Sequence, residues 1–184
     1  LLGGVAAPAA QADCVRPEAI AAPAGEQAFV QTRTLKGLKK PLVSRGAFEI
    51  RGSEVIWSAR EPVRIVTRIT PSGVTQSLEG GPDERIVTEG QGSAVVVAQS
   101  GLYELLRGEL RALETRYAVR RETRAAARNA PAGWRLRLTP KAAALKRWIV
   151  GLEVEGCTRI ERIVIRQTGG DAMSIDFPAP LATR

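Results

Sequence analysis

The sequence predicts a mainly β (α+β) fold, and three observations carry this prediction. Most of the chain alternates apolar and polar residues with a period of two, which is the pattern of half-buried antiparallel strands. Turn signals rich in glycine and proline separate these runs. Residues 100–113 instead place leucines three and four apart, as an amphipathic helix does. Many short strands at this spacing indicate a barrel or a sandwich, and the pattern leaves both open.

The strands are expected where the alternation is clearest. Residues 27–34 fit either the end of a helix or the beginning of a strand, and residues 125–133 fit an exposed loop. No repeat or linker interrupts the chain, so residues 13–184 are expected to form one domain. The alternating runs are residues 48–52, 55–57, 63–69, 115–123, 134–138 and 162–166.

The helical stretch fits either one amphipathic helix or two short helices hinged at Gly108. Ser100 precedes the first apolar residue and is the expected N-cap, because its hydroxyl can accept a hydrogen bond from a free backbone N–H. The leucines that define the apolar face are Leu102, Leu105, Leu106, Leu110 and Leu113.

The first residues are predicted to lie outside the fold. Residues 1–7 are apolar or small, and the triplet Ala10-Gln11-Ala12 has the small-x-small pattern of a signal-peptidase site. Residues 1–12 are therefore interpreted as the remnant of a secretory signal, with an alanine-rich disordered terminus as the alternative. In an oxidising compartment Cys14 and Cys157 can form a disulfide, and the alternative is two unpaired thiols, one exposed and one buried.

Composition excludes several kinds of chemistry. The 184 residues contain no histidine and two cysteines. Ser-His-Asp and Cys-His catalysis and imidazole metal sites are thereby excluded, as are sites of four thiolates. The glycine-rich segment 89–93 lacks the strand–loop–helix context of a nucleotide site. No serine or carboxylate has a recognisable catalytic partner, so the sequence predicts no enzyme, no metal and no cofactor.

The charge is strongly basic. Twenty-seven Lys and Arg residues against 19 Asp and Glu give a net charge of +8, and 22 of the 27 are arginines spread over nearly every strand. This pattern fits a solvated arginine-rich sheet face, or transient attraction to anionic membranes. Nucleic-acid binding fits poorly, because Tyr117 is the one aromatic residue within the basic runs.

Several short motifs occur in an order that resembles the LolA-type periplasmic lipoprotein carrier family. The resemblance spans about residues 26–177, nearly the whole chain after the signal. The motifs are Phe29-Val30-Gln31-Thr32, Gly46-x-Phe48-x-Ile50-Arg51 followed by Trp57 and Pro62, and Leu138-Thr139-Pro140-Lys141 before a strand Leu145-Lys146-Arg147-Trp148.

The resemblance implies an incomplete antiparallel β-barrel with short helices forming a lid over an apolar cavity. It also implies a periplasmic monomer of a Gram-negative bacterium that carries an acylated lipoprotein or other lipid from an inner-membrane donor to an outer-membrane acceptor. Arg51 matches the arginine that locks the lid by hydrogen bonds to its carbonyls. The lid face would be Leu102, Leu105, Leu106 and Leu110, and the residues expected in the cavity are Phe48, Ile50, Val55, Trp57 and Ile65.

The chain departs from the family pattern at two places. Gly52 and Val55 replace a proline and a phenylalanine, and residues 74–78 replace a run of aromatics. We therefore expect a more aliphatic cavity, of several hundred Å³ beneath residues 102–113, and a different cargo. The alternative function is a lipid sensor or assembly partner on the same scaffold without transport. A hydrolase is a third hypothesis, for which no residue can be nominated.

Overall fold

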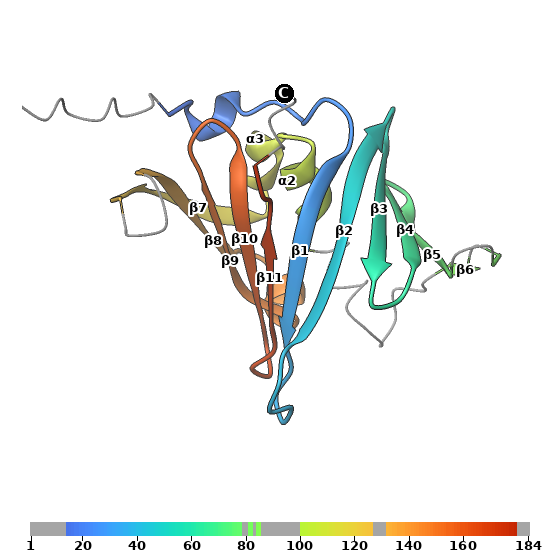
Figure 1. Ribbon diagram of the computed structural model, residues 1–184. Helices are drawn as coiled ribbons and strands as arrows, with labels where there is room; N and C mark the ends of the chain where they lie inside the picture. Colours follow the sequence, from blue (N-terminus) through green and yellow to red (C-terminus); the bar gives the residue numbers. More distant parts are fainter. Residues whose placement is uncertain (1–13, 79–80, 83, 86–99, 127–131, 180–184) are drawn as a thin grey trace, which may run out of the picture.

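The computed structural model describes residues 14–78, 81–82, 84–85, 100–126 and 132–179. Within them, eleven strands form one antiparallel sheet in the order β6-β5-β4-β3-β2-β1-β11-β10-β9-β8-β7 (Figure 1). The strands are β1 (Gln27–Thr34), β2 (Leu42–Arg51), β3 (Glu54–Glu61), β4 (Ile65–Thr70), β5 (Gly73–Leu78), β6 (Glu84–Arg85), β7 (Tyr117–Arg124), β8 (Gly133–Pro140), β9 (Ile149–Gly156), β10 (Ile160–Gln167) and β11 (Ala172–Asp176).

The sheet curves strongly without closing. β1 pairs with β2 on one side and with β11 on the other, so early and late segments of the chain meet in the middle of the sheet. In the described part of the chain β6 and β7 are the two free edges. The predicted mainly β fold and incomplete antiparallel barrel are therefore confirmed, and the ambiguous residues 27–34 belong to a strand.

The period-two pattern determines which face of each strand is buried. In β8 the side chains of Trp134, Leu136 and Leu138 are buried, while Arg135 and Arg137 point to the other face. Successive side chains of a strand point to opposite faces, so one face packs on the core and the other meets solvent. The core lies on the concave side of the sheet, where the helices pack (Figure 1).

The leucine-rich stretch forms two short helices, α2 (Leu102–Leu106) and α3 (Leu110–Leu113). Gly108 between them has φ +72°, a conformation that favours glycine, and this supports the two-helix alternative. The predicted N-cap is wrong. Gly101 caps α2 with φ +81° and no side-chain hydrogen bond, while the buried Ser100 accepts a hydrogen bond at its carbonyl from the hydroxyl of Tyr117.

Two further short helices lie outside this pair, η1 (Pro17–Ala19) and α4 (Ala143–Lys146). The strand expected over residues 145–148 is wrong, because α4 covers its first half and β9 begins at Ile149. Alanine, leucine and lysine are strong helix formers, which accounts for the helix. No helix among the described residues is long and apolar enough to cross a bilayer.

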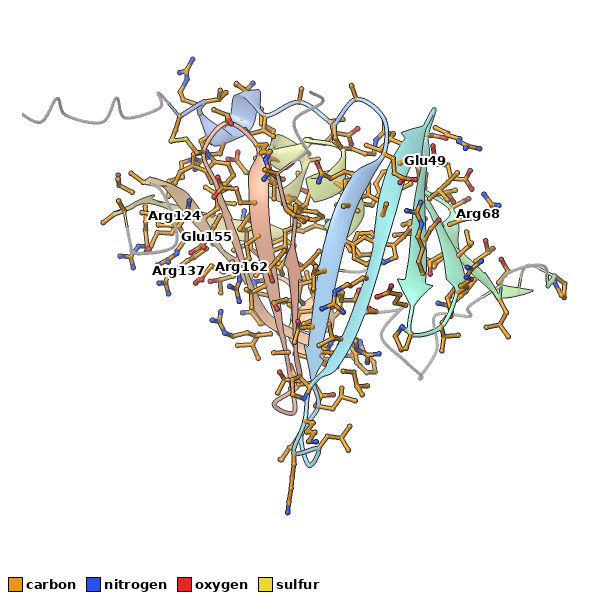
Figure 2. All side chains as sticks on the ribbon, viewed as in Figure 1. Glu49, Arg68, Arg124, Arg137, Glu155 and Arg162 are labelled. Carbon is orange, nitrogen blue, oxygen red and sulfur yellow. A yellow bond between two sulfur atoms is a disulfide. The ribbon has the colours of Figure 1, made fainter. Side chains whose placement is uncertain are left out.

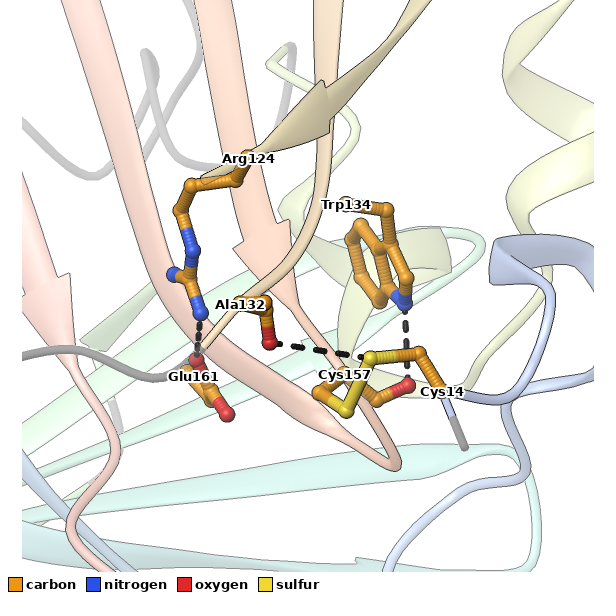
Figure 3. Close-up of a disulfide and its surroundings, with 6 residues drawn as sticks. All are labelled: Cys14, Arg124, Ala132, Trp134, Cys157 and Glu161. Atoms are coloured by element: carbon orange, nitrogen blue, oxygen red, sulfur yellow. Dashed lines mark hydrogen bonds and ion pairs between the residues drawn. A yellow bond between two sulfur atoms is a disulfide. The ribbon is translucent and has the colours of Figure 1, made fainter. Parts of the chain in front are cut away.

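A disulfide joins Cys14 to Cys157, with the sulfur atoms 2.17 Å apart (Figure 3). The carbonyl of Cys157 accepts hydrogen bonds from the indole N–H of Trp134 and from the backbone N–H of Val15. The bond ties the N-terminal segment to the turn between β9 and β10. The proposed signal remnant, residues 1–12, lies outside the described residues.

The outer face of the sheet carries arginines paired with carboxylates on neighbouring strands, several of which are labelled in Figure 2. Arg135 contacts Glu155 at 2.5 Å, Arg137 contacts Glu122 at 3.1 Å and Arg162 contacts Asp176 at 3.6 Å. Each exposed pair contributes about 0–1 kcal/mol. The arginine-rich face is therefore partly neutralised within the sheet.

Candidate functional site

The described residues line two cavities, one mainly on the inward face of the strands and one between the sheet, the helices and the N-terminal segment. The larger, cavity A, has a volume of about 610 Å³, and the smaller, cavity B, about 310 Å³. Leu102 of α2 lines cavity A, whereas Leu105 and Leu106 of the same helix line cavity B. The expected cavity of several hundred Å³ beneath this helical stretch therefore corresponds to two hollows, one on each side of α2.

Inward-facing side chains of consecutive strands build cavity A. Trp57 and Ala59 are two residues apart on β3 and so share one face, and Ile65 of β4 pairs with Ala59. Met173 of β11 closes the wall on the other side of β1. Among the described residues, Trp57 is the one aromatic side chain that lines cavity A, whereas Phe48 and Phe177 line cavity B. The expectation of a more aliphatic cavity therefore stays a prediction.

In the part of the chain that the structure describes, Arg33 of β1 is the one charged side chain that lines cavity A. It is half-buried, and within the described residues it forms no ion pair or side-chain hydrogen bond. The other polar groups are neutral, and two of them satisfy each other, because Gln76 donates to Thr67 at 3.1 Å. As far as the described residues go, cavity A thus combines a mainly apolar wall with a single unpaired positive charge.

Cavity B lies between the helices, the N-terminal segment and the aromatic residues Phe48 and Phe177. The ring of Trp57 stacks on Phe29 with centroids 3.7 Å apart, and on Phe48 with centroids 5.8 Å apart. Trp57 lines cavity A and Phe48 lines cavity B, so their stacked rings lie between the two hollows. We call Phe29, Phe48 and Trp57 the aromatic partition.

The helix pair α2–α3 is held to the turn between β2 and β3. Arg107 donates to the carbonyl of Gly52 at 2.7 Å, and the hydroxyl of Tyr103 donates to the carbonyl of Ser53 at 2.8 Å. The hydrogen bond from Arg107 to Glu109 raises the pKa of the Arg107 guanidinium, so this donor stays charged. The helices therefore supply the donors and the strand turn supplies the carbonyls.

Arg51 has a different place from the one that the resemblance implies. Its side chain is 69% exposed and pairs with Glu49 at 2.7 Å. Phe48 and Ile50 point towards the core, so Glu49 and Arg51 point outward, away from the helices. In this structure the contact with the helices is made by the turn directly after Arg51 and not by the arginine itself. The sequence already indicated this outward position, because Arg51 alternates with the apolar residues Phe48 and Ile50.

The other expected site residues divide into three groups. Trp57 and Ile65 line cavity A, and Phe48 lines cavity B. Ile50 and the fully buried Val55 pack in or against the core and line neither cavity. Of the four leucines expected on the lid, Leu102 lines cavity A, Leu105 and Leu106 line cavity B, and Leu110 is buried without lining either.

A buried phenol connects the helices to β7. The hydroxyl of Tyr117 donates to the carbonyl of Ser100 at 3.0 Å, directly before α2. Burial raises the pKa of Tyr117 to about 12. The phenol is therefore neutral at physiological pH, and its role here is to satisfy a buried carbonyl. The mainly apolar linings of cavities A and B are suited to removing an apolar chain from water.

Comparison with known proteins finds a matching family and similar solved structures. The model of the family described as outer membrane lipoprotein carrier protein LolA-like matches residues 4–172. A DUF1329 family protein from Desulfovibrio piger shares 10% identity at a TM-score of 0.44, over 83% of this chain and 82% of that one. A putative outer membrane lipoprotein-sorting protein domain from Vibrio parahaemolyticus shares 10% identity at a TM-score of 0.41, over 84% of each chain. No curated protein matches the chain.

Proposed function

The chain belongs to the LolA-like family of outer membrane lipoprotein carriers, and from this premise we propose that it carries a lipid through the periplasm towards the outer membrane. The observation that supports the proposal is cavity A, a mainly apolar hollow of about 610 Å³ on the concave face of the sheet. Cavities of about 300–1,000 Å³ are typical of small-molecule sites. The cargo would place an acyl chain in this cavity.

The energetics suit a carrier. Each methylene moved from water into an apolar site contributes about 0.8 kcal/mol, so ten methylenes contribute about 8 kcal/mol. A bilayer offers the same chain a similar gain, so transfer needs a step that lowers the carrier's affinity. Movement of α2–α3 would be that step, because Leu102 leaves cavity A when α2 moves away from the sheet. The hydrogen bonds of Tyr103 and Arg107 oppose this movement, each by about 1 kcal/mol.

Filling cavity A should weaken lipid binding. In the variant Ala59→Phe the new ring would occupy space within the cavity, because Ala59 lines it. Excluding about two methylenes of the ligand should lower the affinity for a fluorescent fatty acid about tenfold. The measurement is a fluorescence titration of the purified protein, with mass spectrometry of lipids that copurify.

The matched control is Ser58→Phe. Ser58 is the adjacent residue on β3, so it points to the opposite face and carries the same ring outside the cavity. This variant should bind the fatty acid as the wild type does. Equal affinity of Ala59→Phe and the wild type, with both folded, would contradict the proposed use of cavity A.

We further propose that the cargo carries an anionic group near its acyl chain, because Arg33 is the one charge that the described residues contribute to the lining of cavity A. A guanidinium donates two parallel hydrogen bonds to a carboxylate or phosphate. Arg33 has no competing partner within the described residues, so binding an anion breaks no existing ion pair there. A neutral amphiphile would leave this charge without a partner.

The variant Arg33→Gln should lower the affinity for a fatty acid about fivefold to tenfold. The expected loss is moderate because solvent at this half-exposed site weakens the ion pair between Arg33 and the carboxylate. The affinity for a fatty alcohol of the same length should stay unchanged. Both are measured by competition against the fluorescent probe. Arg45→Gln removes an outward-facing arginine of β2 and serves as the control for net charge. An equal loss for acid and alcohol would show that Arg33 acts only through packing.

A further inference from the structure

All five lysines lie in two connections of the sheet. Lys36, Lys39 and Lys40 are in the turn between β1 and β2, and Lys141 and Lys146 are in the connection between β8 and β9. The register brings these connections to the same end of the sheet. The end of β1 pairs with the beginning of β11, and the end of β10 pairs with the beginning of β9. We call residues 35–43 and 141–150 the lysine end.

The two parts of the lysine end are joined through the turn between β10 and β11. Thr168 of this turn donates its N–H to the carbonyl of Trp148 and its hydroxyl to the carbonyl of Lys146, each at 3.0 Å. On the other side, the carboxylate of Asp171 accepts a hydrogen bond from the backbone N–H of Lys36 at 2.7 Å. The lysine end is therefore one continuous surface, at the narrow lower end of the molecule in Figure 1.

This surface is also the most apolar part of the exterior. Among the described residues, eight large hydrophobic side chains are exposed, and five of them belong to the lysine end. Exposed apolar side chains gathered in one place, and not scattered singly, mark a surface that binds a partner. The five are Leu38, Leu42, Val43, Trp148 and Val150.

The charges of the lysine end are free to bind a partner. Several arginines of the outer sheet face are paired with carboxylates, as described above for Arg135, Arg137 and Arg162. Within the described residues no lysine forms an ion pair with a carboxylate, although Lys141 donates to the carbonyl of Glu114. Within the described residues, the lysine ammonium groups are therefore not neutralised by carboxylates.

We propose that the lysine end docks on the surface of an anionic phospholipid bilayer. Basic residues near such a surface are attracted to its lipid headgroups. Leu38 and Trp148 would enter the interface, where leucine and tryptophan side chains are favoured, and the lysines would keep their ammonium groups at the headgroups. A protein partner fits less well, because protein–protein interfaces are depleted in lysine.

Docking in this way orients the cavity. Leu42 and Val43 belong to the lysine end and also line cavity A. A bilayer that contacts them would therefore lie beside cavity A, on the path that an acyl chain would take. This orientation rests on the proposed function, whereas the docking surface does not. Vesicle binding without cargo and fatty-acid binding without vesicles are separate measurements, so either can fail alone.

The test is flotation with vesicles of phosphatidylcholine alone and of phosphatidylcholine mixed with phosphatidylglycerol. We expect the wild type to bind the anionic vesicles, and the variant with Lys36, Lys39 and Lys40 replaced by Gln to bind them about 100-fold more weakly. Trp148→Ala should weaken binding with all charges kept. Rising salt should release the wild type from anionic vesicles.

The matched control replaces Arg120, Arg137 and Arg162 by Gln, which removes three exposed charges from the outer sheet face. Binding should then fall much less than in the lysine variant. An equal fall in both variants would overturn the proposal, because net charge alone would explain it. Equal binding to neutral and anionic vesicles, or no binding to either, would also overturn it. Circular dichroism confirms that each variant is folded.

Discussion

Replacing both Cys14 and Cys157 by serine should lower the free energy of unfolding by about 2–5 kcal/mol. The disulfide joins residues 143 positions apart, so it restricts the unfolded chain strongly. It also fixes the N-terminal segment over the helices, where Ile20 is buried and lines cavity B. Chemical denaturation of the oxidised wild type and the double variant measures the difference.

A second comparison separates the bond from the serines. Reduction of the wild type should produce the same loss, and the double variant should not respond to the reductant. The N-terminal segment is also held by contacts other than the disulfide. It packs so closely on Gly108 that a Cβ at this position would lie only 2.4 Å from the carbonyl oxygen of Ile20. A loss below about 1 kcal/mol would mean that these contacts alone keep the segment in place.

Much of the fold could be predicted because strand alternation is a local property. The pattern in residues 134–138 and 162–166 correctly indicated which side chains are buried. The role of residues 27–34 could not be predicted. β1 is a strand because β2 and the distant β11 both pair with it, and this is a property of the whole sheet.

The site was harder to predict, for two different reasons. The outward position of Arg51 was predictable from parity with Phe48 and Ile50, and the resemblance concealed this signal. The division between cavity and core was not predictable. Val55 and Trp57 share one face of β3, yet Val55 is fully buried in the core whereas Trp57 lines cavity A. The curvature of the sheet and the position of α2 decide which of the two meets empty space.

The gathering of the lysines shows the same limit. Lys36 and Lys146 are 110 positions apart in the sequence, where arginines outnumber lysines 22 to five and obscure the pattern. Only the strand order brings their connections to one end of the sheet. The five lysines are visible in the sequence, but their position on one surface follows only from the topology of the sheet.

The variant Trp57→Ala should lower the free energy of unfolding by about 3–5 kcal/mol. The indole is 8% exposed and stacks on both Phe29 and Phe48, so its removal takes away buried area and ring contacts from the centre of the fold. Trp148→Ala is the matched control, because Trp148 is 43% exposed. It should lower stability much less than Trp57→Ala does, while weakening vesicle binding.

The milder variant Trp57→Leu tests what the aromatic partition does. A leucine keeps the apolar wall but is smaller than the indole, which lies between cavities A and B. If the rings limit how far an acyl chain can enter, this variant should bind longer fatty acids more tightly relative to short ones. Competition across a series of chain lengths measures the preference. An unchanged preference in a folded variant would show that an acyl chain does not reach the partition, so its rings only pack the core.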